Sequence, residues 1–379
     1  MNVVTLGGCG AMGRATSYEL AGRTDIELTI ADADIDTARE LAADLPGTVE
    51  TKRVDVTDHE HLVDVLADAD VVANALPYTF NIDVMEACLE ADAHYLDLGG
   101  LYHKTQEQLE LDEAFEEAEL TAVLGIGASP GLTNIAAAMG ASHLDRVDEV
   151  HIRTGAKGGG EGFAYSAKTI LDELTMNPIV FEDGEFLELE PLSGRETYTM
   201  PDPVGEVEGF HSIHSELATM PYTFDGVETV DFRVAFSPDL VNICDVLIGL
   251  NLTSEEKIEF KNATFTPREF LDWHLDQQPK PGAVEEWKSF RVDVAGEEDG
   301  EATQYQYSVV VESRLDDWGL KATAVWTGVP MGIAAELVGR GEALETGAKP
   351  PEQVLNPEQF IDELRKRDIV INESDSPSS

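Results

Sequence analysis

Three glycines near the N-terminus have a spacing that suits binding of a pyrophosphate. Gly8, Gly10 and Gly13 follow a short apolar run, residues 3–6, and precede a stretch of helical composition, residues 11–21. In a strand–turn–helix of this kind, the glycines allow a tight turn, close approach of the phosphates and close packing of helix on strand. The helix start offers free N–H groups to the anion. A glycine-rich turn in another α/β protein is the alternative; we predict a dinucleotide site comprising Gly8, Gly10, Ala11, Met12 and Gly13.

An acidic residue ends the second apolar run, residues 26–31. Asp32 lies about 20 residues after Gly13, where a carboxylate can accept hydrogen bonds from the ribose hydroxyls of a dinucleotide. No Lys or Arg follows Asp32 before Arg39, so a 2′-phosphate would meet the negative charge of Asp32 and Asp34. The pattern therefore favours NAD over NADP as the cofactor.

Two later loops extend this predicted site, because ligands of doubly wound sheets lie beyond the carboxyl ends of the strands. The strands concerned are predicted at residues 48–54 and 71–76. We add the residues that follow or end these strands to the predicted cofactor site; they are Asp55, Val56, Ala75, Leu76 and Pro77. Tyr78 follows directly, and we place it among the catalytic-site residues, holding a polar end of the substrate. A packed tyrosine beside a proline-terminated loop is the alternative.

A carboxylate, an imidazole and an amine lie close together in sequence, at the end of the strand predicted at 94–97 and just after it. They are Asp97, His103 and Lys104, and groups of these types can transfer protons. We predict that Asp97 orients the substrate amine or a catalytic water, and that His103 or Lys104 handles the proton. Asp97 could instead cap the next turn, and the other two could be surface residues at a helix start. The next candidates in the middle of the chain are Arg153, Glu173 and His211.

A segment that contains Gly and Pro, residues 127–134, follows the strand predicted at 121–126. Gly127 and Gly131 permit unusual backbone angles, so the segment can act as a rigid hinge that opens a helix at 132–139. We predict that the substrate contacts Ser129, Pro130 and Asn134, which is compatible with a hinge. No metal site is expected, because there is no Cys-x-x-Cys pair and no His pair with a suitable acid; His211 and His214 with Glu216 do not make a zinc site.

Composition narrows the class of protein. The 379 residues include 74 Asp and Glu against 25 Lys and Arg, a net charge of −49 that is spread along nearly the whole chain. The apolar periodicity excludes an acidic disordered chain, so we interpret the charge as adaptation to a very salty cytoplasm. Nucleic acid is an unsuitable partner at this charge. Three cysteines and the absence of a signal peptide or apolar span predict a cytoplasmic protein with no membrane contact.

The elements that must position these residues fall into two patterns. Strands and helices alternate through the first third, which predicts a Rossmann-type doubly wound parallel sheet; besides the runs above, it has helices at 35–45, 59–66, 82–90 and 105–118 and strands at 94–97 and 121–126. The middle alternates apolar and polar residues, as a mostly antiparallel sheet does. Its predicted strands are 147–154, 181–189, 229–235, 291–295, 304–314 and 320–326, with helices at 166–174, 255–260 and 270–275. Near the end we predict helices at 330–340 and 357–367 and a strand at 369–371.

This change of pattern divides the chain. We predict a dinucleotide-binding domain made of residues 1–128 and 329–371, interrupted by an inserted α+β domain, residues 129–328, for substrate binding and oligomer contacts. Residues 372–379 are polar and are predicted to form a disordered tail. We also expect a homodimer or a higher homo-oligomer.

The chain resembles the saccharopine dehydrogenase family, in its broad sense, along nearly its whole length. The resemblance rests on residues 8–13, 70–77, 87–88, 94–97, 129–134, 171–175, 327–330, 350–360 and 364–369. It implies a nicotinamide dinucleotide domain split by a substrate domain, and a reaction at the C–N bond of an amino-acid-type or polyamine-like substrate through an imine. Saccharopine-forming members carry Asp where this chain has Ser129, and the Ser129-Pro130-Gly131 version is nearer to lysine 6-dehydrogenase-like members.

Two other functions are compatible with the same scaffold. A carbonyl or enoyl reductase would turn over ketones or enones and ignore amines. A non-catalytic dinucleotide-binding regulator would keep the glycine turn and lack the chemistry.

Overall fold

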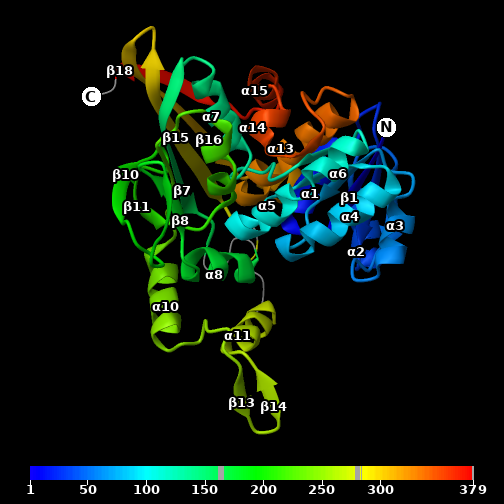
Figure 1. The fold of residues 1–379 in the computed structure, drawn as a ribbon. Helices are drawn as coiled ribbons and strands as arrows, with labels where there is room; N and C mark the ends of the chain where they lie inside the picture. The colour runs from blue at the N-terminus through cyan, green and yellow to red at the C-terminus, as the bar shows by residue number, and fades with distance from the viewer. Residues whose placement is uncertain (161–165, 278–281, 283, 378–379) are drawn as a thin grey trace.

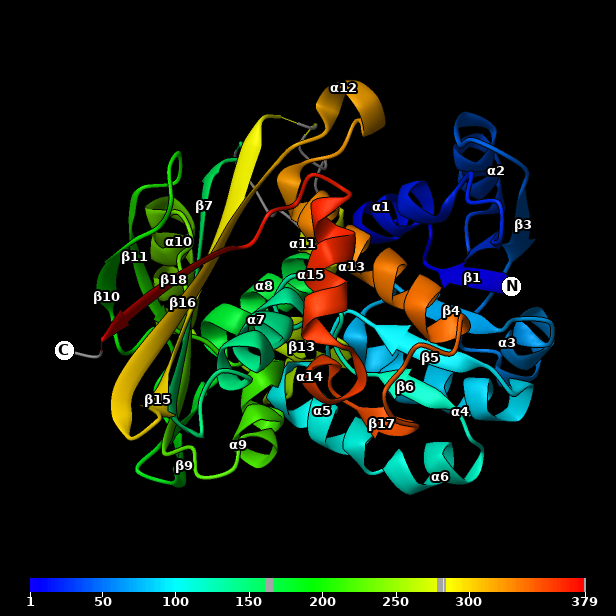
Figure 2. The same ribbon diagram turned by 90° about the horizontal axis from the view of Figure 1, so that it is seen from above.

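Two sheets dominate the computed structural model, which describes residues 1–160, 166–277, 282 and 284–377. Figure 1 shows a compact helix-covered half and a half with long, bent strands. Figure 2 shows from above that helices α7 (Leu132–Ala141) and α13 (Ala322–Gly339) lie between the two sheets. The predicted combination of a Rossmann-type sheet with a mostly antiparallel second sheet is confirmed.

The first sheet has seven parallel strands in the order β17-β6-β5-β4-β1-β2-β3. They are β1 (Asn2–Leu6), β2 (Glu27–Asp32), β3 (Val49–Arg53), β4 (Val71–Asn74), β5 (His94–Asp97), β6 (Thr121–Val123) and β17 (Gly347–Lys349). From β3 to β6 this is the order of dinucleotide-binding folds, in which the chain reverses direction between β1 and β4. The carboxyl ends of these strands therefore border one cleft.

Alternate residues of the first sheet pack into two cores. Val3, Leu28 and Ile30 face one side, with apolar residues of α1 and α2, whereas Val4 and Leu6 face the side of α3 and α4. The covering helices are α1 (Ala11–Leu20), α2 (Ile35–Asp44), α3 (His59–Leu66), α4 (Asn81–Ala91), α5 (Leu101–Leu109) and α6 (Asp112–Glu117). The first core continues through α13 and α7 into the second sheet, so the two halves share one apolar interior.

The second sheet is antiparallel except where β7 pairs with β12. Its strands are β10 (Glu196–Thr199), β11 (Glu206–His211), β12 (Thr229–Val234), β7 (Arg146–Gly158), β15 (Glu286–Glu298), β16 (Glu301–Glu312) and β18 (Asn372–Pro377), with the hairpin β8 (Ile179–Glu182) and β9 (Glu185–Glu188) attached to β12. The smaller helices are α8 (Ala167–Thr175), α9 (Met220–Thr223), α12 (Leu315–Trp318), α14 (Pro351–Val354) and α15 (Pro357–Arg365).

One segment projects from the body as an arm. It consists of α10 (Pro238–Gly249), the hairpin β13 (Ile258–Phe260) and β14 (Ala263–Phe265), and α11 (Pro267–Asp276). Figure 1 shows the hairpin at the far end of this arm. Among the helices of the described residues, none combines the length and apolar composition that crossing a bilayer needs.

Two predicted elements have the wrong type. Residues 320–326, predicted as a strand, form the start of the helix α13 from Ala322 onward. Sixteen of its eighteen residues are buried, so it lacks the apolar stripe of a surface helix, and Pro330 lies inside it rather than at its start. Residues 255–260, predicted as a helix, contain β13, where Ile258 and Phe260 alternate with Glu259.

Other errors concern boundaries. The helix predicted at 105–118 is two helices, α5 and α6. The strand predicted at 181–189 is the hairpin β8–β9, whose turn at Asp183-Gly184 has positive φ at both residues. The strand predicted at 369–371 is wrong, and the predicted disordered tail instead contains β18, which pairs with β16; residues 378–379 lie outside the described part.

Candidate active site

A cavity of about 1000 Å³ is lined by residues from both halves of the molecule. The glycine turn and the loop after β4 form one end, through residues such as Gly10, Met12 and Leu76. The other end comes from α8, the β11–α9 segment, β12, β15 and the start of α13. A chamber of this size, bordered by the carboxyl ends of a doubly wound sheet, suits a dinucleotide together with a small substrate.

The glycine turn has the shape that a pyrophosphate requires. A Cβ on Gly13 would lie 2.3 Å from the carbonyl oxygen of Gly7 and 2.7 Å from Cα of Gly8, so only glycine fits. Gly10, Ala11 and Met12 line the cavity, and no side chain caps the start of α1. Its first N–H groups therefore remain available to an anion. Gly8 and Gly13 shape the turn without lining the cavity.

Asp32 lies at the end of β2 with both carboxylate oxygens engaged. Oδ2 accepts a hydrogen bond from the Cys9 N–H at 3.0 Å, and Oδ1 accepts one from the Asp34 N–H at 3.1 Å. These bonds fix the carboxylate beside the turn. Burial, followed by the charge of Asp32, raises the pKa of the Cys9 thiol to about 12.

The other predicted cofactor residues divide into two groups. Ala75, Leu76 and Pro77 line the cavity. Asp55 and Val56 lie beyond β3 and do not line it; the Asp55 carboxylate accepts hydrogen bonds from the hydroxyl (2.6 Å) and the N–H of Thr57, which lower its pKa.

The structure does not bring together the three groups predicted for proton transfer. Asp97 is buried and lies outside the cavity lining, and its carboxylate accepts hydrogen bonds from the N–H groups of Gly99 (2.7 Å) and Gly125 (2.8 Å). Burial raises its pKa. His103 and Lys104 lie on α5 outside the cavity lining: His103 is exposed, and Lys104 pairs with Glu107. Asp97 thus holds two loops together, as in the capping alternative. His103 and Lys104 project from α5 away from the cavity.

Tyr78 lines the cavity, but its hydroxyl is engaged. It donates a 2.8 Å hydrogen bond to Oδ2 of Asp172 on α8, whose Oδ1 accepts a 2.5 Å bond from Arg268 on α11. Burial, followed by the charge of Asp172, holds the pKa of Tyr78 well above its ordinary value. Tyr78 therefore fastens the nucleotide half to the second half and is poorly suited to exchange protons.

Of the residues predicted to contact substrate, Ser129 and Pro130 line the cavity and Asn134 does not. Asn134 is buried, accepts a bond from the Gly131 N–H and donates one of 2.7 Å to Glu352. Its amide therefore holds the hinge to α14. Burial raises the pKa of Glu352 to about 7.

A buried histidine–glutamate pair, which the sequence reasoning missed, faces the same cavity. Nδ1 of His214 contacts Oε2 of Glu216, and Oε1 of Glu216 accepts hydrogen bonds from the hydroxyls of Ser129 (2.6 Å) and Thr133 (2.7 Å). His214 also stacks on Phe232, with ring centroids 3.9 Å apart. His214 and Ser129 line the cavity, whereas Glu216 is fully buried.

The pair shifts both of its own pKa values. Burial alone would lower the pKa of His214, but the charge and hydrogen bond of Glu216 raise it. Burial alone would raise the pKa of Glu216, but His214, Ser129 and Thr133 lower it. With Nδ1 held by Glu216, Nε2 of His214 has no hydrogen-bond partner among the described residues. It is the nitrogen that can take or give a proton in the cavity.

The further candidates from the middle of the chain, Arg153, Glu173 and His211, do not lie together. Glu173 lines the cavity. Arg153 and His211 lie outside its lining, beside Asp231, with Arg153 bonded to that carboxylate at 2.8 Å. The described residues contain no group of three or more His, Cys, Asp or Glu side chains that could hold a metal ion.

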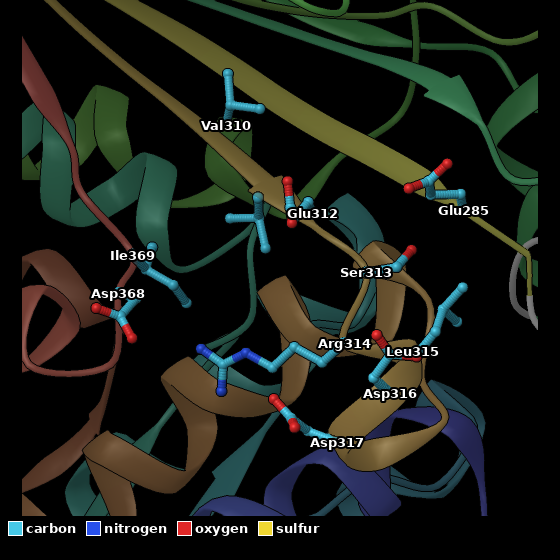
Figure 3. Close-up of a pocket in the computed structure, with 11 residues that line it drawn as sticks. Glu285, Val310, Glu312, Ser313, Arg314, Leu315, Asp316, Asp317, Asp368 and Ile369 are labelled. Carbon is cyan, nitrogen blue, oxygen red and sulfur yellow. The ribbon is translucent and has the colours of Figure 1, made fainter.

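A second hollow of about 590 Å³ lies on another face, between α12, the end of β16 and the loop before β18. Figure 3 shows Arg314 reaching across it among Asp316, Asp317 and Asp368. The Arg314 guanidinium bonds to the Arg367 carbonyl and lies 4.5 Å from the Trp318 ring centroid. This hollow contains no residue of the glycine turn and is not part of the site.

Comparison with known proteins agrees with this geometry. Residues 3–123 match the saccharopine dehydrogenase NADP binding domain, and residues 127–370 match the saccharopine dehydrogenase C-terminal domain. The chain belongs to the saccharopine dehydrogenase family. The predicted family and enzyme class, an NAD(P)-dependent oxidoreductase, are thereby confirmed.

Several relatives match along nearly their whole length. Carboxyaminopropylagmatine dehydrogenase from Synechocystis is 26% identical, over 96% of this chain and 95% of its own. Carboxynorspermidine synthase from Vibrio cholerae is also 26% identical, over 94% and 93%. The solved saccharopine dehydrogenase of Saccharomyces cerevisiae, 18% identical, superposes with a TM-score of 0.75 over 99% of both chains, which shows a shared fold.

Proposed function

We propose that this protein oxidises, or forms by reduction, a secondary amine that joins a carboxyl-bearing carbon unit to an amino-acid or polyamine-like group. The observation that carries the proposal is the single cavity that joins the glycine turn to the His214–Glu216–Ser129 cluster. The two relatives named for carboxylated polyamines support this substrate class more than lysine or saccharopine.

The residues that line the cavity would have separate roles in cofactor binding and in proton transfer. Gly10, Ala11 and Met12 would hold the pyrophosphate of a nicotinamide dinucleotide, which supplies hydride transfer when bound. Nε2 of His214 takes the proton from the substrate ammonium, because only a neutral amine has the lone pair that forms the C=N bond. Glu216 holds Nδ1 and stabilises the resulting imidazolium. The Ser129 hydroxyl, fixed by Glu216, lies in the cavity wall where it can orient the amine or the water that attacks the imine.

We propose NAD rather than NADP as the preferred dinucleotide. The support is Asp32, held beside the glycine turn, and Asp34, whose carboxylate caps α2. Against it stand the NADP in the name of the matching family domain and Arg53, which pairs in register with Asp32 from β3. Titration with NADH and NADPH tests the choice. Asp32→Ala should reduce the preference for NADH, and equal affinity of the unmutated protein for both would overturn it.

A substrate panel tests the reaction. Purified protein in molar salt is given NAD or NADP with carboxynorspermidine, carboxyaminopropylagmatine, saccharopine and lysine, and reduced dinucleotide is measured. We expect turnover of one or both carboxylated polyamines. Turnover of ketones or enones alone would favour a carbonyl or enoyl reductase, and dinucleotide binding without any turnover would favour a regulator.

The domain division rests on packing. We propose that residues 1–128 and 329–371 form the dinucleotide-binding domain and that 129–328 form the inserted domain. The support is that β17 pairs with β6 and that α13 packs on α1. The proposed boundary at residue 329 falls inside α13, and this helix also contacts β15 and β16 of the second sheet.

We also propose that the arm joins two copies of this chain. Of thirteen large apolar side chains exposed in the described part of the chain, eight lie between Ile243 and Trp273. On α10, Val241 and Cys244 face the body while Ile243 and Val246 are exposed, so this helix is apolar on two sides and needs a second cover. A contiguous exposed apolar surface of this kind is typical of a protein–protein interface.

Location and salt dependence are further proposals. The cysteines Cys9, Cys88 and Cys244 are all free, and two of them are buried, which suits a reducing cytoplasm. The net charge of −49 suits a salt-rich one, because ions would screen the repulsion between acidic side chains.

A further inference from the structure

A lysine in the cavity wall has no carboxylate partner. Lys288 lies on β15 and lines the cavity, with its Nζ 5.7 Å from the ring centroid of Trp326 on α13. No carboxylate among the described residues forms an ion pair with it, although Asp and Glu outnumber Lys and Arg 74 to 25 in this chain. An unpaired ammonium in a half-buried site is costly unless a ligand supplies the missing charge.

The nearby charged groups leave this ammonium unmatched. Oε2 of Glu286 accepts bonds from the N–H (2.6 Å) and hydroxyl (2.7 Å) of Thr323, which fixes the start of α13. The other lysine of this wall, Lys321, donates a 2.7 Å bond to a main-chain carbonyl. Burial lowers the pKa of Lys288, and the charges of Glu286 and Glu173 offset this only in part. An anion beside Nζ would favour the charged form.

We propose that Lys288 forms a carboxylate subsite, which binds the carboxyl group of the substrate and selects carboxylated secondary amines over the same amines without a carboxyl. This inference rests on the proposed function and goes beyond it, because it names the residue that recognises the carboxyl group. A carboxylate there gains a charge-assisted hydrogen bond while the apolar faces of Trp326 and Phe232 line the same chamber.

The alternative anion is a phosphate of the dinucleotide. The glycine turn already offers main-chain N–H groups, and Arg14 on α1 is a further cavity-lining cation beside them. Lys288 lies instead on the second sheet, which contributes no residue to that turn. The geometry therefore favours the substrate as the partner of Lys288.

The test compares Lys288→Met with a matched control, Lys157→Met. Lys157 lies on β7 one register position away, opposite Trp287, and its side chain is exposed and does not line the cavity. The KM for carboxynorspermidine, for norspermidine and for the dinucleotide is measured for each protein. We expect Lys288→Met to raise the KM for carboxynorspermidine roughly 10- to 100-fold, with little change for norspermidine or the dinucleotide. Lys288→Arg should recover much of the loss, and Lys157→Met should behave as the unmutated protein.

Two outcomes overturn the subsite. One is an unchanged preference for the carboxylated amine in Lys288→Met, and the other is a raised KM for the dinucleotide with the substrate KM unaffected. If the unmutated protein turns over none of the amines, the proposed function fails instead. The subsite is then tested by calorimetric titration of glutarate into the NADH complex: binding that is lost in Lys288→Met supports it, and binding equal in both proteins excludes it. If Lys288→Met does not fold, Lys288→Gln replaces it in every arm.

Discussion

The two ends of the cavity are built in different ways. The pyrophosphate-binding part of the cofactor end is made of main-chain groups on consecutive residues, Gly10 to Met12, and its shape depends on a glycine, Gly13, where a Cβ does not fit. The substrate end is made of side chains that come from separate elements, among them Ser129, His214 and Lys288. Main-chain N–H groups can bind the pyrophosphate of a dinucleotide, because this group is the same in every such cofactor. A particular substrate is recognised by charged and hydrogen-bonding side chains at defined positions. Variants of the two ends should therefore fail in different measurements.

Replacing His214 should give the largest effect at the substrate end. His214→Gln removes the proposed base but keeps a polar side chain beside Glu216, so kcat should fall ~10²- to 10⁴-fold. Dinucleotide affinity, measured by fluorescence titration, should not change. His103→Gln is the matched control, because that ring is exposed and does not line the cavity. A normal kcat for His214→Gln would remove His214 from the mechanism.

At the cofactor end, Gly13→Ala should reverse this pattern. The added Cβ would lie 2.3 Å from the Gly7 oxygen, so the turn must shift. Overpacking of this kind costs about 1–3 kcal/mol, which corresponds to roughly 5- to 150-fold in dinucleotide affinity if the strain falls on the turn. Gly249→Ala is the control, since a Cβ added there would have no atom of the surrounding structure within 4 Å. If dinucleotide affinity is kept and only substrate KM rises, the assignment of the two ends is wrong.

How far the sequence could predict each end follows from this difference. Residues 8–13 are contiguous, so their spacing alone indicated the turn, and the strand order followed from the alternating pattern. Glu216 is linked to Ser129, a residue far away in the sequence, and only the fold brings them together. His214 and Glu216 are close in the sequence, but from their spacing alone they could be considered only as possible metal ligands. Asp97, at the end of a strand as expected, holds loops because its oxygens meet two glycine N–H groups.

The charge coupling at the substrate end can be tested by pH. Glu216 raises the pKa of His214, so Glu216→Gln should lower it. In the oxidative direction the neutral imidazole is the active form, and activity is lost as the pH falls through the pKa of His214. The acidic limb of the kcat profile should therefore move to lower pH in Glu216→Gln, with a fall in the plateau of about 10-fold because the imidazolium loses its counter-charge. An acidic limb that stays in place would show that another group titrates there.

The smallest expected effect concerns stability rather than rate. Burial raises the pKa of Glu352 to about 7, above its ordinary value of 4.5, so the folded protein favours the protonated form. The stabilisation is fully present below pH 4.5 and is lost as the pH rises through about 7.

Glu352→Gln keeps a neutral side chain between Asn134 and Thr219, so it should remove this loss and raise stability at pH 8 by on the order of 1–3 kcal/mol. Denaturant unfolding at pH 5 and pH 8 measures it, and the difference between the two pH values should be smaller in the variant. Because Asn134 and Glu352 lie outside the cavity lining, kcat should remain near normal. A large fall in kcat would show that the hinge, residues 127–134, takes part in substrate binding or turnover.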